Sequence, residues 1–595
     1  MASFPKSTKQ PIAVTHYSNI DLSCQHITTG NFMEFNVAKA MELCPRQTID
    51  IDMRTFARLA PMPLPTYGNA DIKNRAYFVP FRTVMKGWNE FIDDTTVVDA
   101  SGEPIIPLVL QIPLMNLIKM FLYSSMSTVT NGTADFVHID TGGVTTSRVF
   151  TPAGKHAYKL LCSLGYRIAF DERASNTFTL SALPLLCLLK LYFDWYFPSA
   201  YVDDDRANSV RRMLNLSPTA DSDDFFSYFS SRNLEEIFGI LYRVSYDSDY
   251  FVSAWDNPVA PNNGAYSSII VNDTTTDDSA IINTEANGTP VAKWSFNLSQ
   301  FSVDALKSVT DYMRRHQIAG ARVLDRYLSR WGVRLPDAAL DRSVFIGESI
   351  RKIDFGDVTA TTDSFNEEAG TGSVLGGYAG KGIGDNIGDN FVHYSTDEYG
   401  MLIIVSTIVP KTAYYQGMDR CTFHTSRFDF YTPEFDNLGT QALATRELYV
   451  PIRDYAQTDE LNGIDYDAAV FGFTPRYAEY KRGYDNMTGD LVLASKNTGL
   501  EGWTLMRDVS TYFDSRAIGG YADVVHDQGF VQGVDSNQYN RIFYVTDNVE
   551  DKFYIIHNFK IQSRFPGKSL YDSYEFKDYD KAENVHIDVN GVRAN

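Results

Sequence analysis

Residues 553–562, Phe-Tyr-Ile-Ile-His-Asn-Phe-Lys-Ile-Gln, decide the fold class. Successive side chains of a β-strand point to opposite faces, so alternating character indicates a strand with one buried face. Here one face would carry Phe553, Ile555, His557, Phe559 and Ile561. The stretch Gln47–Met53 repeats the pattern near the other end of the chain, with Ile49, Ile51 and Met53 on one face. We therefore predict core strands at both ends of the chain.

Further strand and helix patterns lie between these two stretches. Met401–Val405 is a short apolar run typical of a fully buried strand, and a Gly-Gly turn at 142–143 joins two alternating segments into a predicted hairpin, Phe136–Asp140 with Val144–Phe150. Helical periodicity appears over Leu185–Phe197, from Ser302 to Met313, and from Leu324 to Trp331, where Gly332 is the predicted stop. No repeat of 20–50 residues occurs, so we expect one domain over residues 1–595.

Two long stretches follow neither period. Asn257–Phe296 is rich in Asn, Thr, Ser and Gly, and Gly370–Gly400 is rich in glycine. Irregular segments of this length are uncommon in compact domains and are usually functional or disordered. We predict a surface insertion at about 257–296, a Gly-rich loop at about 370–400 and a flexible arm at residues 1–30. The predicted fold class is an all-β core with long, partly helical insertions between its strands.

Charge restricts the partners of this chain. Its 53 Lys and Arg residues against 74 Asp and Glu residues give a net charge of −21, so a basic face for duplex DNA is not expected. The first twenty residues carry Lys6 and Lys9 and no acid, which makes these two lysines candidate contacts to nucleic acid at a flexible end.

Cysteine use and hydropathy point to a cytoplasmic protein without a membrane span. The five cysteines are scattered, with no Cys-x-x-Cys pair, so neither a disulfide framework nor a zinc site is expected. The N-terminus lacks an apolar signal segment, and Pro184, Lys190 and Asp194 interrupt the most apolar run, Leu180–Phe197. We expect synthesis in a cytoplasm and no insertion into a membrane.

The motifs that suggest chemistry are incomplete. Gly567-Lys-Ser569 lacks the first glycine of a phosphate-binding loop, and Gly380–Gly384 lacks the dinucleotide spacing, so a turn and a flexible loop are favoured. Gly347–Arg351 misses the last glycine of a nucleophile elbow. Asp203-Asp-Asp205 suits a solvated loop better than a cation site, and His557 suits a buried strand better than a reaction. We predict no catalytic residue, no metal and no cofactor.

Several stretches, taken in order, resemble the major capsid protein of the microviruses, small single-stranded DNA phages, and most of all the gokushovirus-like branch. They are Asp50–Ala60, Tyr77–Arg82, Trp88–Phe91, Asp249–Ala254, Arg330–Leu340, Tyr415–Arg420, Arg427–Tyr431, Leu438–Gln441, Phe471-Gly472 and Arg476–Tyr480. Two departures are Thr432, where many relatives have an aromatic residue, and Trp255–Pro258, which replaces a Pro-rich continuation.

The resemblance implies an eight-stranded antiparallel viral jelly roll and no enzymatic activity. It implies about sixty copies in a T=1 icosahedral shell around a circular single-stranded DNA genome, assembled in a bacterial cytoplasm and found in the virion. Implied partners are a small basic DNA-binding protein, internal scaffolding and pilot proteins of the phage, and a host receptor. The insertion at 257–296 matches a threefold protrusion of the relatives. We expect short strands there at Ser268–Asn272 and Ala280–Asn283, with these candidate host contacts: Asn262, Asn263, Thr274, Thr275 and Thr276.

Two other classes of function remain open from the sequence. A secreted glycan-binding β-sandwich would explain the aromatic content, because aromatic faces stack on sugars, but it predicts an export signal. A cytoplasmic β-sandwich scaffold predicts internal repeats. A passive loop that packs subunits together is the alternative to host contact at 257–296.

Overall fold

The computed structural model describes 27 segments of the chain, and the structural statements below concern these residues: 17–85, 87–92, 97–98, 104–105, 111–113, 126–129, 137–140, 145–150, 152–167, 179–197, 243–255, 281–284, 290–293, 327–328, 331–333, 342–359, 378–425, 429–436, 440–450, 470–493, 500–509, 530–531, 533, 536–546, 550–566, 586–587 and 593–594.

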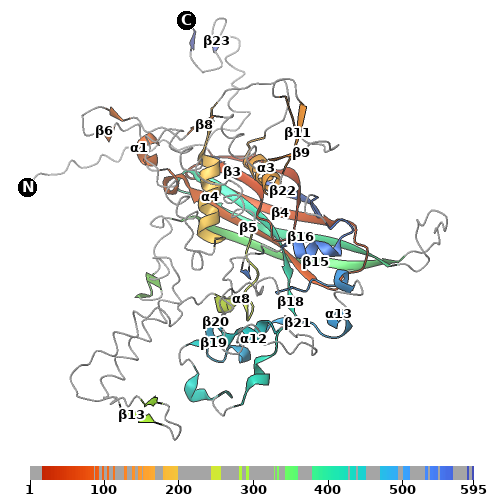
Figure 1. Ribbon diagram of the computed structural model, residues 1–595. Helices are drawn as coiled ribbons and strands as arrows, with labels where there is room; N and C mark the ends of the chain where they lie inside the picture. The colour runs from red at the N-terminus through yellow and green to blue at the C-terminus, as the bar shows by residue number, and fades with distance from the viewer. Residues whose placement is uncertain are drawn as a thin grey trace, which may run out of the picture.

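A curled antiparallel sheet forms the centre of the molecule (Figure 1). Its strands are β1 (Tyr17–Asp21), β2 (Cys24–Gly30), β3 (Asn36–Leu43), β4 (Thr48–Leu59), β5 (Asn69–Pro80), β15 (Val344–Thr359), β16 (Tyr378–Ser395), β17 (Gly400–Lys411) and β22 (Phe553–Pro566). The order across the sheet is β1-β22-β4-β16-β15-β5-β17-β3, and β2 also pairs with β22. The last long strand therefore lies between the first two strands and β4.

The alternating patterns at the two chain ends meet in this sheet. β22 pairs with β4 so that Phe559 is opposite Met53 and Ile561 opposite Ile51, and all four side chains are buried. Full burial of such side chains contributes about 1.5–3 kcal/mol each. The prediction that Phe553–Ile561 forms a core strand is confirmed. His557 is also buried, next to the hydroxyl of Thr55 at 3.0 Å, and burial followed by repulsion from His26 lowers its pKa to about 3.

The two halves of the sheet differ in what covers their outer faces. β5 and β17 are buried on both faces, because helices α3 (Pro152–Leu164) and α4 (Leu183–Trp195) pack over that half (Figure 1). Tyr196 beside α4 stacks edge-on against Phe35 at 4.8 Å, and the Trp195 indole donates to the Ser343 hydroxyl at 2.9 Å. β4 and β22 are buried on one face only and expose alternate side chains on the other.

Short elements occupy the connections between the long strands and the stretch after β22. They are η1 (Phe81–Thr83), α1 (Trp88–Ile92), β6 (Val97–Val98), β7 (Pro104–Ile105), β8 (Gln111–Pro113), β9 (Met126–Val129), β10 (Val137–Asp140), β11 (Thr145–Phe150), β12 (Thr179–Ser181), β13 (Ile281–Thr284), β14 (Pro290–Lys293), α13 (Asp490–Leu493), η7 (Leu500–Trp503), η10 (Ser536–Ile542), β23 (His586–Ile587) and β24 (Arg593–Ala594). None of the described helices is both long enough and apolar enough to span a membrane.

Several local predictions are confirmed. β10 and β11 form the expected hairpin, α4 covers most of Leu185–Phe197, and β17 contains the buried run Met401–Val405. Gly332 has a φ of 65° and donates its N–H to the Leu328 carbonyl at 2.9 Å, as a helix stop should. β13 overlaps the strand expected at Ala280–Asn283, whereas Ser268–Asn272 and the helix from Ser302 to Met313 lie outside the described residues.

Two boundaries were wrong. A flexible arm was expected at residues 1–30, but from Tyr17 onward this part of the chain forms strands β1 and β2 of the sheet. Most of the loop expected at about 370–400 is strand β16. A Cβ at Gly382 would stand 2.5 Å from the Leu59 side chain, and one at Gly384 would stand 2.4 Å from that of Ile72. These glycines let neighbouring side chains lie on the bare strand, and a strand without side chains shows no alternating pattern in the sequence.

Candidate functional site

Segments from three distant parts of the chain gather at one end of the sheet into what we call the insertion unit (Figure 1). It consists of α8 (Val252–Trp255), β18 (Ala413–Tyr414), η4 (Arg420–Phe423), η5 (Pro433–Phe435), β19 (Thr440–Ala444), α12 (Thr445–Leu448), β20 (Val470–Pro475), η6 (Ala478–Tyr480) and β21 (Asp485–Asn486). β19 pairs with β20, and β18 pairs with β21. Arg420, Gln441 and Glu479, which belong to three separate motifs in the sequence, are therefore neighbours in space.

Arg420 joins these motifs. Its guanidinium lies 3.0 Å from the Glu447 carboxylate and 3.7 Å from that of Glu479, and it also donates to the Ala442 carbonyl at 3.1 Å. Glu447 in turn accepts the Ala444 N–H at 3.1 Å and the Tyr250 hydroxyl at 2.9 Å. Burial raises the pKa of Glu447 in spite of the Arg420 charge. Every member of this cluster is engaged, and such a network fixes one geometry.

A second set of contacts holds the chain next to Arg420. The N–H of Met418 donates to the Arg446 carbonyl at 3.2 Å, and that of Val450 donates to the Gln416 carbonyl at 2.9 Å. A Cβ at Gly417 would lie only 1.9 Å from the Glu447 carbonyl oxygen. Glycine is therefore required for this segment to lie against α12.

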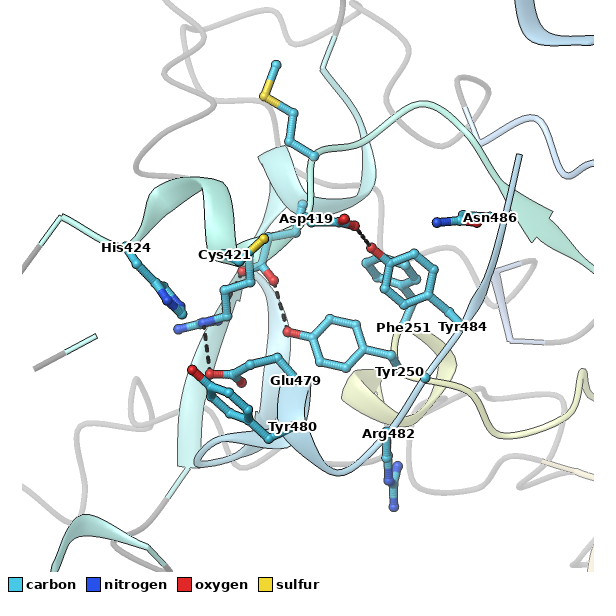
Figure 2. Close-up of a pocket in the computed structure, with 14 residues that line it drawn as sticks. Tyr250, Phe251, Asp419, Cys421, His424, Glu479, Tyr480, Arg482, Tyr484 and Asn486 are labelled. Atoms are coloured by element: carbon cyan, nitrogen blue, oxygen red, sulfur yellow. Dashed lines mark hydrogen bonds and ion pairs between the residues drawn. The ribbon is translucent and has the colours of Figure 1, made fainter. Parts of the chain in front are cut away.

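A pocket of about 340 Å³ opens beside Arg420 (Figure 2). Its wall includes the rings of Tyr250, Phe251, Tyr480 and Tyr484, together with these polar or sulfur-bearing residues: Met418, Asp419, Arg420, Cys421, His424, Glu447, Glu479, Arg482 and Asn486. The Tyr484 hydroxyl donates to Asp419, and the Arg482 side chain points away from the cluster (Figure 2). Among the described residues, no group of three or more His, Cys, Asp or Glu side chains is placed to hold a metal ion.

A buried arginine, Arg507, contacts Tyr414, whose ring packs against the pocket residues Phe251 and Tyr484. Arg507 is fully buried, lies over the rings of Tyr246 and Phe530 at 4.1 and 4.2 Å, and is 3.5 Å from the Tyr414 hydroxyl. That hydroxyl donates to Asp249 at 2.7 Å. Asp249 also accepts the N–H of Val252, at the start of α8, and burial raises its pKa. This chain of contacts fixes α8 immediately before the stretch at 257–296.

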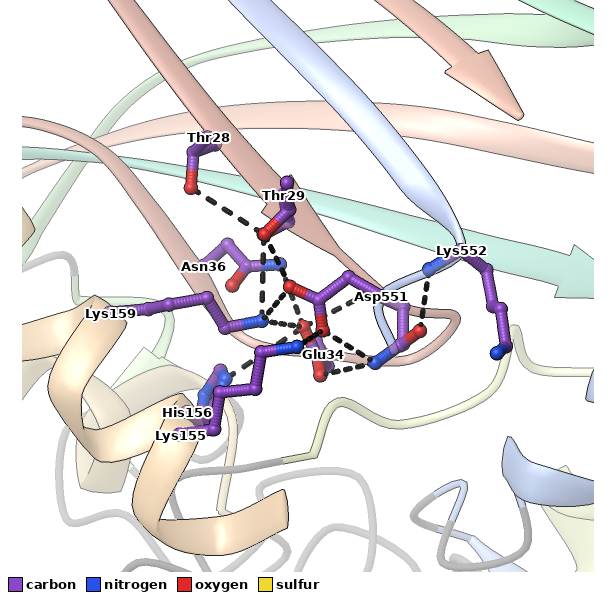
Figure 3. A network of polar contacts seen from close by, with 10 residues as sticks. Thr28, Thr29, Glu34, Asn36, Lys155, His156, Lys159, Asp551 and Lys552 are labelled. Atoms are coloured by element: carbon purple, nitrogen blue, oxygen red, sulfur yellow. Dashed lines mark hydrogen bonds and ion pairs between the residues drawn. The ribbon is translucent and has the colours of Figure 1, made fainter. Parts of the chain in front are cut away.

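A third cluster, which we call the α3 clamp, joins side chains of helix α3 to the loops beside strands β2 and β22 (Figure 3). Lys159 of α3 donates to Glu34 at 2.9 Å and to Asp551 at 3.2 Å. Asn31 donates its side-chain amide to both carboxylates, at 3.0 and 3.1 Å. Burial alone would raise the pKa of Glu34, but the charges of Lys159 and His156 outweigh it and lower the pKa to about 2. The clamp ties the β2–β3 turn, α3 and the start of β22 together.

The residues singled out from the sequence as sites lie outside the described residues. These are Lys6 and Lys9 at the N-terminus and Asn262, Asn263, Thr274, Thr275 and Thr276 in the insertion. The structure neither brings them together nor separates them. It does place the base of that insertion, because Tyr250 and Phe251 line the pocket and α8 follows them.

Sequence reasoning missed the clusters themselves. Arg420 and Glu479 stand in motifs that were recognised, so their pairing could have been suggested by the motifs occurring together. Glu447, Arg507 and the clamp residue Lys159 carry no local signal, because each depends on a partner at least 23 residues away in sequence.

Comparison with known proteins gives consistent matches. The model of a family described as capsid protein (F protein) matches residues 10–131 and 256–554, which is more than half of the chain. Three relatives are each named capsid protein VP1. That of Chlamydia phage 1 is 27% identical over 198 residues, 32% of this chain and 30% of the relative. That of Spiroplasma virus 4 is 23% identical over 211 residues, 35% of each chain.

The third relative is matched over a longer stretch. Capsid protein VP1 of Bdellovibrio phage phiMH2K is 21% identical over 473 residues, which cover 74% of this chain and 76% of the relative. The match to this chain covers about a third of the length of each of the first two relatives.

Proposed function

This chain belongs to the family of phage capsid proteins that the F protein model describes, and from this premise we propose that it is a structural capsid protein that builds a closed shell by self-assembly. The observation that carries the proposal is the family match over two long stretches, together with relatives that are all capsid proteins of phages. It favours the shell over the glycan-binding β-sandwich and the scaffold. The role is structural rather than enzymatic.

We propose further that the curled sheet is the eight-stranded jelly roll of viral capsids. The strand order supports this. Strands β15 and β16 are neighbours at the middle of the sheet, and the sheet divides between them into two groups of four. The first group contains β22, β4, β16 and the β1–β2 segment, which is counted here as one strand. The second group contains β15, β5, β17 and β3. Each group combines strands from both ends of the chain, as two Greek keys do, and a jelly roll consists of two Greek keys.

The proposed shell has T=1 symmetry with about sixty copies and encloses a circular single-stranded DNA genome. At a net charge of −21 the chain is a poor neutraliser of phosphate, so we propose that a separate small basic protein carries most of that task. Lys6 and Lys9 are proposed to add local contacts from the N-terminal end. We propose that the chain assembles in a bacterial cytoplasm with the help of scaffolding and pilot proteins of the phage. Its final location is the virion.

Particle formation tests this function directly. We expect the full-length chain, expressed with the other proteins of its phage, to sediment as closed particles that electron microscopy shows to be icosahedral, with a mass close to sixty chains. A stable monomer in mature material from the source would overturn the proposal. Particles of another triangulation number would overturn only the T=1 assignment.

The segment at 257–296 is proposed to contact the host surface. Deleting residues 262–287 should give particles that assemble but adsorb to cells at least about tenfold less, because the polar side chains that suit such a contact are removed. Adsorption of labelled particles to the host measures this.

A second variant keeps the length of the segment and replaces Asn262, Asn263, Thr274, Thr275 and Thr276 by alanine. If contact with the host is the role, this variant assembles and adsorbs poorly too. Loss of assembly in the deletion, with normal adsorption of the alanine variant, would show that the segment packs subunits together instead.

A further inference from the structure

The connection between strands β4 and β5 belongs to a surface built from segments without charge. Residues 59–70 contain no Lys, Arg, Asp or Glu, although such residues make up 21% of the chain. Two further segments without charge, 502–506 and 542–546, lie against this connection. Three neighbouring segments of this kind stand out in a chain whose net charge is −21.

Backbone hydrogen bonds hold the three segments together. The Tyr67 N–H donates to the Trp503 carbonyl at 2.6 Å, and the Tyr544 N–H donates to the Pro61 carbonyl at 2.9 Å. The connection also has a proline at every second position from Pro61 to Pro65, and each proline fixes its own φ. The surface is therefore rigid before any partner binds, and a rigid surface loses little conformational entropy on binding.

Aromatic side chains project from this surface. Tyr67 is 71% exposed and Tyr544 is 78% exposed, which places both among the most exposed large hydrophobic side chains of the described residues. The Tyr67 ring stacks on Trp503, with ring centroids 5.9 Å apart. Tyr and Trp are enriched among the residues that dominate binding at interfaces. We define the aromatic patch as Pro61, Leu64, Tyr67, Trp503, Tyr544 and Val545.

The size of the aromatic patch suits the centre of a protein contact. An aromatic side chain carries ~150–250 Å² of surface, so two tyrosines exposed over about three quarters of it offer roughly 300 Å². The largest apolar patch on a monomer covers ~300–600 Å² and is often functional. A stable contact buries about 800 Å² on each partner, so the aromatic patch can form the apolar centre of a contact that has a polar rim.

Charge selects the partner. Two copies of a chain with a net charge of −21 repel each other over much of their surface, so they approach most favourably through segments that carry no charge. A basic protein or a nucleic acid is recognised through charged groups, and the three segments of the aromatic patch have none. The partner that this chemistry favours is a second copy of the same chain.

We propose that the aromatic patch is a contact surface between copies of this chain and that Tyr67 and Tyr544 become buried against the neighbouring subunit. The inference rests on the proposed function and adds the place of one subunit contact. The two tyrosines are exposed in the single chain, and the contact removes their rings from water, which favours association.

The test compares two full-length variants that each lose two exposed tyrosines. The patch variant carries Tyr67→Ser and Tyr544→Ser. The control carries Tyr17→Ser and Tyr554→Ser, at positions 40% and 53% exposed on strands β1 and β22. Both keep the net charge of −21. Sedimentation of chains expressed with the other proteins of the phage measures the fraction in particles, and analytical ultracentrifugation of the isolated chain measures self-association.

The patch variant should form at least about tenfold fewer particles and self-associate at least about tenfold more weakly, because it lacks the aromatic centre of the contact. The control should behave like the unmodified chain in both measurements. Urea unfolding checks that both variants are folded.

A single substitution, Tyr544→Asp, keeps the test valid if the patch variant fails to fold. The Tyr544 side chain is 78% exposed, so aspartate leaves the core intact but adds negative charge to a contact between negatively charged copies. Self-association should fall at least about tenfold at ~0.15 M salt. Part of it should return at ~1 M salt, where the Debye length falls from ~8 Å to ~3 Å.

Two results separate the aromatic patch from the proposed function. If folded patch variants form particles and self-associate like the control, the patch is not a subunit contact, even if these particles lack a companion protein or adsorb poorly to cells. If the unmodified chain forms no particles, the proposed function is wrong. The patch still stands in that case if the isolated chain self-associates and the patch variant weakens this association.

Discussion

Replacing Lys159 by methionine should lower the free energy of unfolding by about 3–5 kcal/mol, because it leaves a buried carboxylate without its cation. Glu34 is 1% exposed, and Lys159 is the cation within hydrogen-bond distance of it, at 2.9 Å. Asp551 loses a partner at 3.2 Å in the same substitution. Methionine keeps most of the aliphatic length of lysine, so the change removes charge more than packing. Urea unfolding of the full-length chain measures the difference.

Two companion variants separate the buried charge from other causes. Lys481→Met removes a cation from an exposed pair with Asp436 and should cost less than about 1 kcal/mol. The double variant Glu34→Gln, Lys159→Met should recover part of the loss, because it leaves no unpaired charge of Glu34 in the core. A cost below about 1 kcal/mol for Lys159→Met would mean that the α3 clamp does not hold α3 to the sheet.

The clamp also shows where prediction from sequence ends. Strands β4 and β22 could be predicted from the sequence, because a strand with one buried face alternates apolar and polar residues within its own segment. Glu34, Lys159 and Asp551 leave no such record. They come from three segments, and Lys159 and Asp551 are 392 residues apart, so their pairing is a consequence of the strand order and not of any local pattern.

Strand β16 illustrates a different limit. Its glycines at 380, 382 and 384 were interpreted as a loop, because glycine is enriched in turns and weakens strands. In the structure they are the positions where the side chains of Met62, Leu59 and Ile72 lie against the strand. The glycines make room for side chains of β4, of β5 and of the connection between them, and this reason depends on contacts between segments that are distant in sequence.

The pocket was predicted least well. Its motifs were recognised in order along the chain, yet nothing local indicated that Arg420, Glu447 and Glu479 would share one wall. Tyr477, with a φ of 61°, helps to set this geometry: its N–H donates to the Gln441 side chain at 3.0 Å, and Gln441 donates to Glu479 at 2.6 Å. Such strained residues persist only where their surroundings hold them, which is why they mark the insertion unit as a built structure.

Replacing Gly417 by alanine should disrupt the insertion unit. The added methyl group would stand 1.9 Å from the Glu447 carbonyl oxygen and 2.8 Å from the Leu448 carbonyl carbon, and these are backbone atoms of α12 that cannot rotate away. The segment at 416–418 must therefore move, which breaks the hydrogen bonds from Met418 to Arg446 and from Val450 to Gln416 and draws Arg420 away from Glu447. We expect a loss of roughly 3 kcal/mol, at the upper end of the usual cost of overpacking, and a lower yield of particles.

Gly483 provides the matched control, because it lines the same pocket and a Cβ there would meet nothing within 4 Å. Gly483→Ala should change the free energy of unfolding by less than about 1 kcal/mol, and a small gain is consistent with the reduced freedom of the unfolded chain. Urea unfolding and particle yield are measured for both variants side by side. If the two alanine substitutions behave alike, the close approach of residue 417 to α12 does not hold the insertion unit together. If only Gly417→Ala loses both stability and particles, the wall that contains Arg420 is needed for assembly as well as for folding.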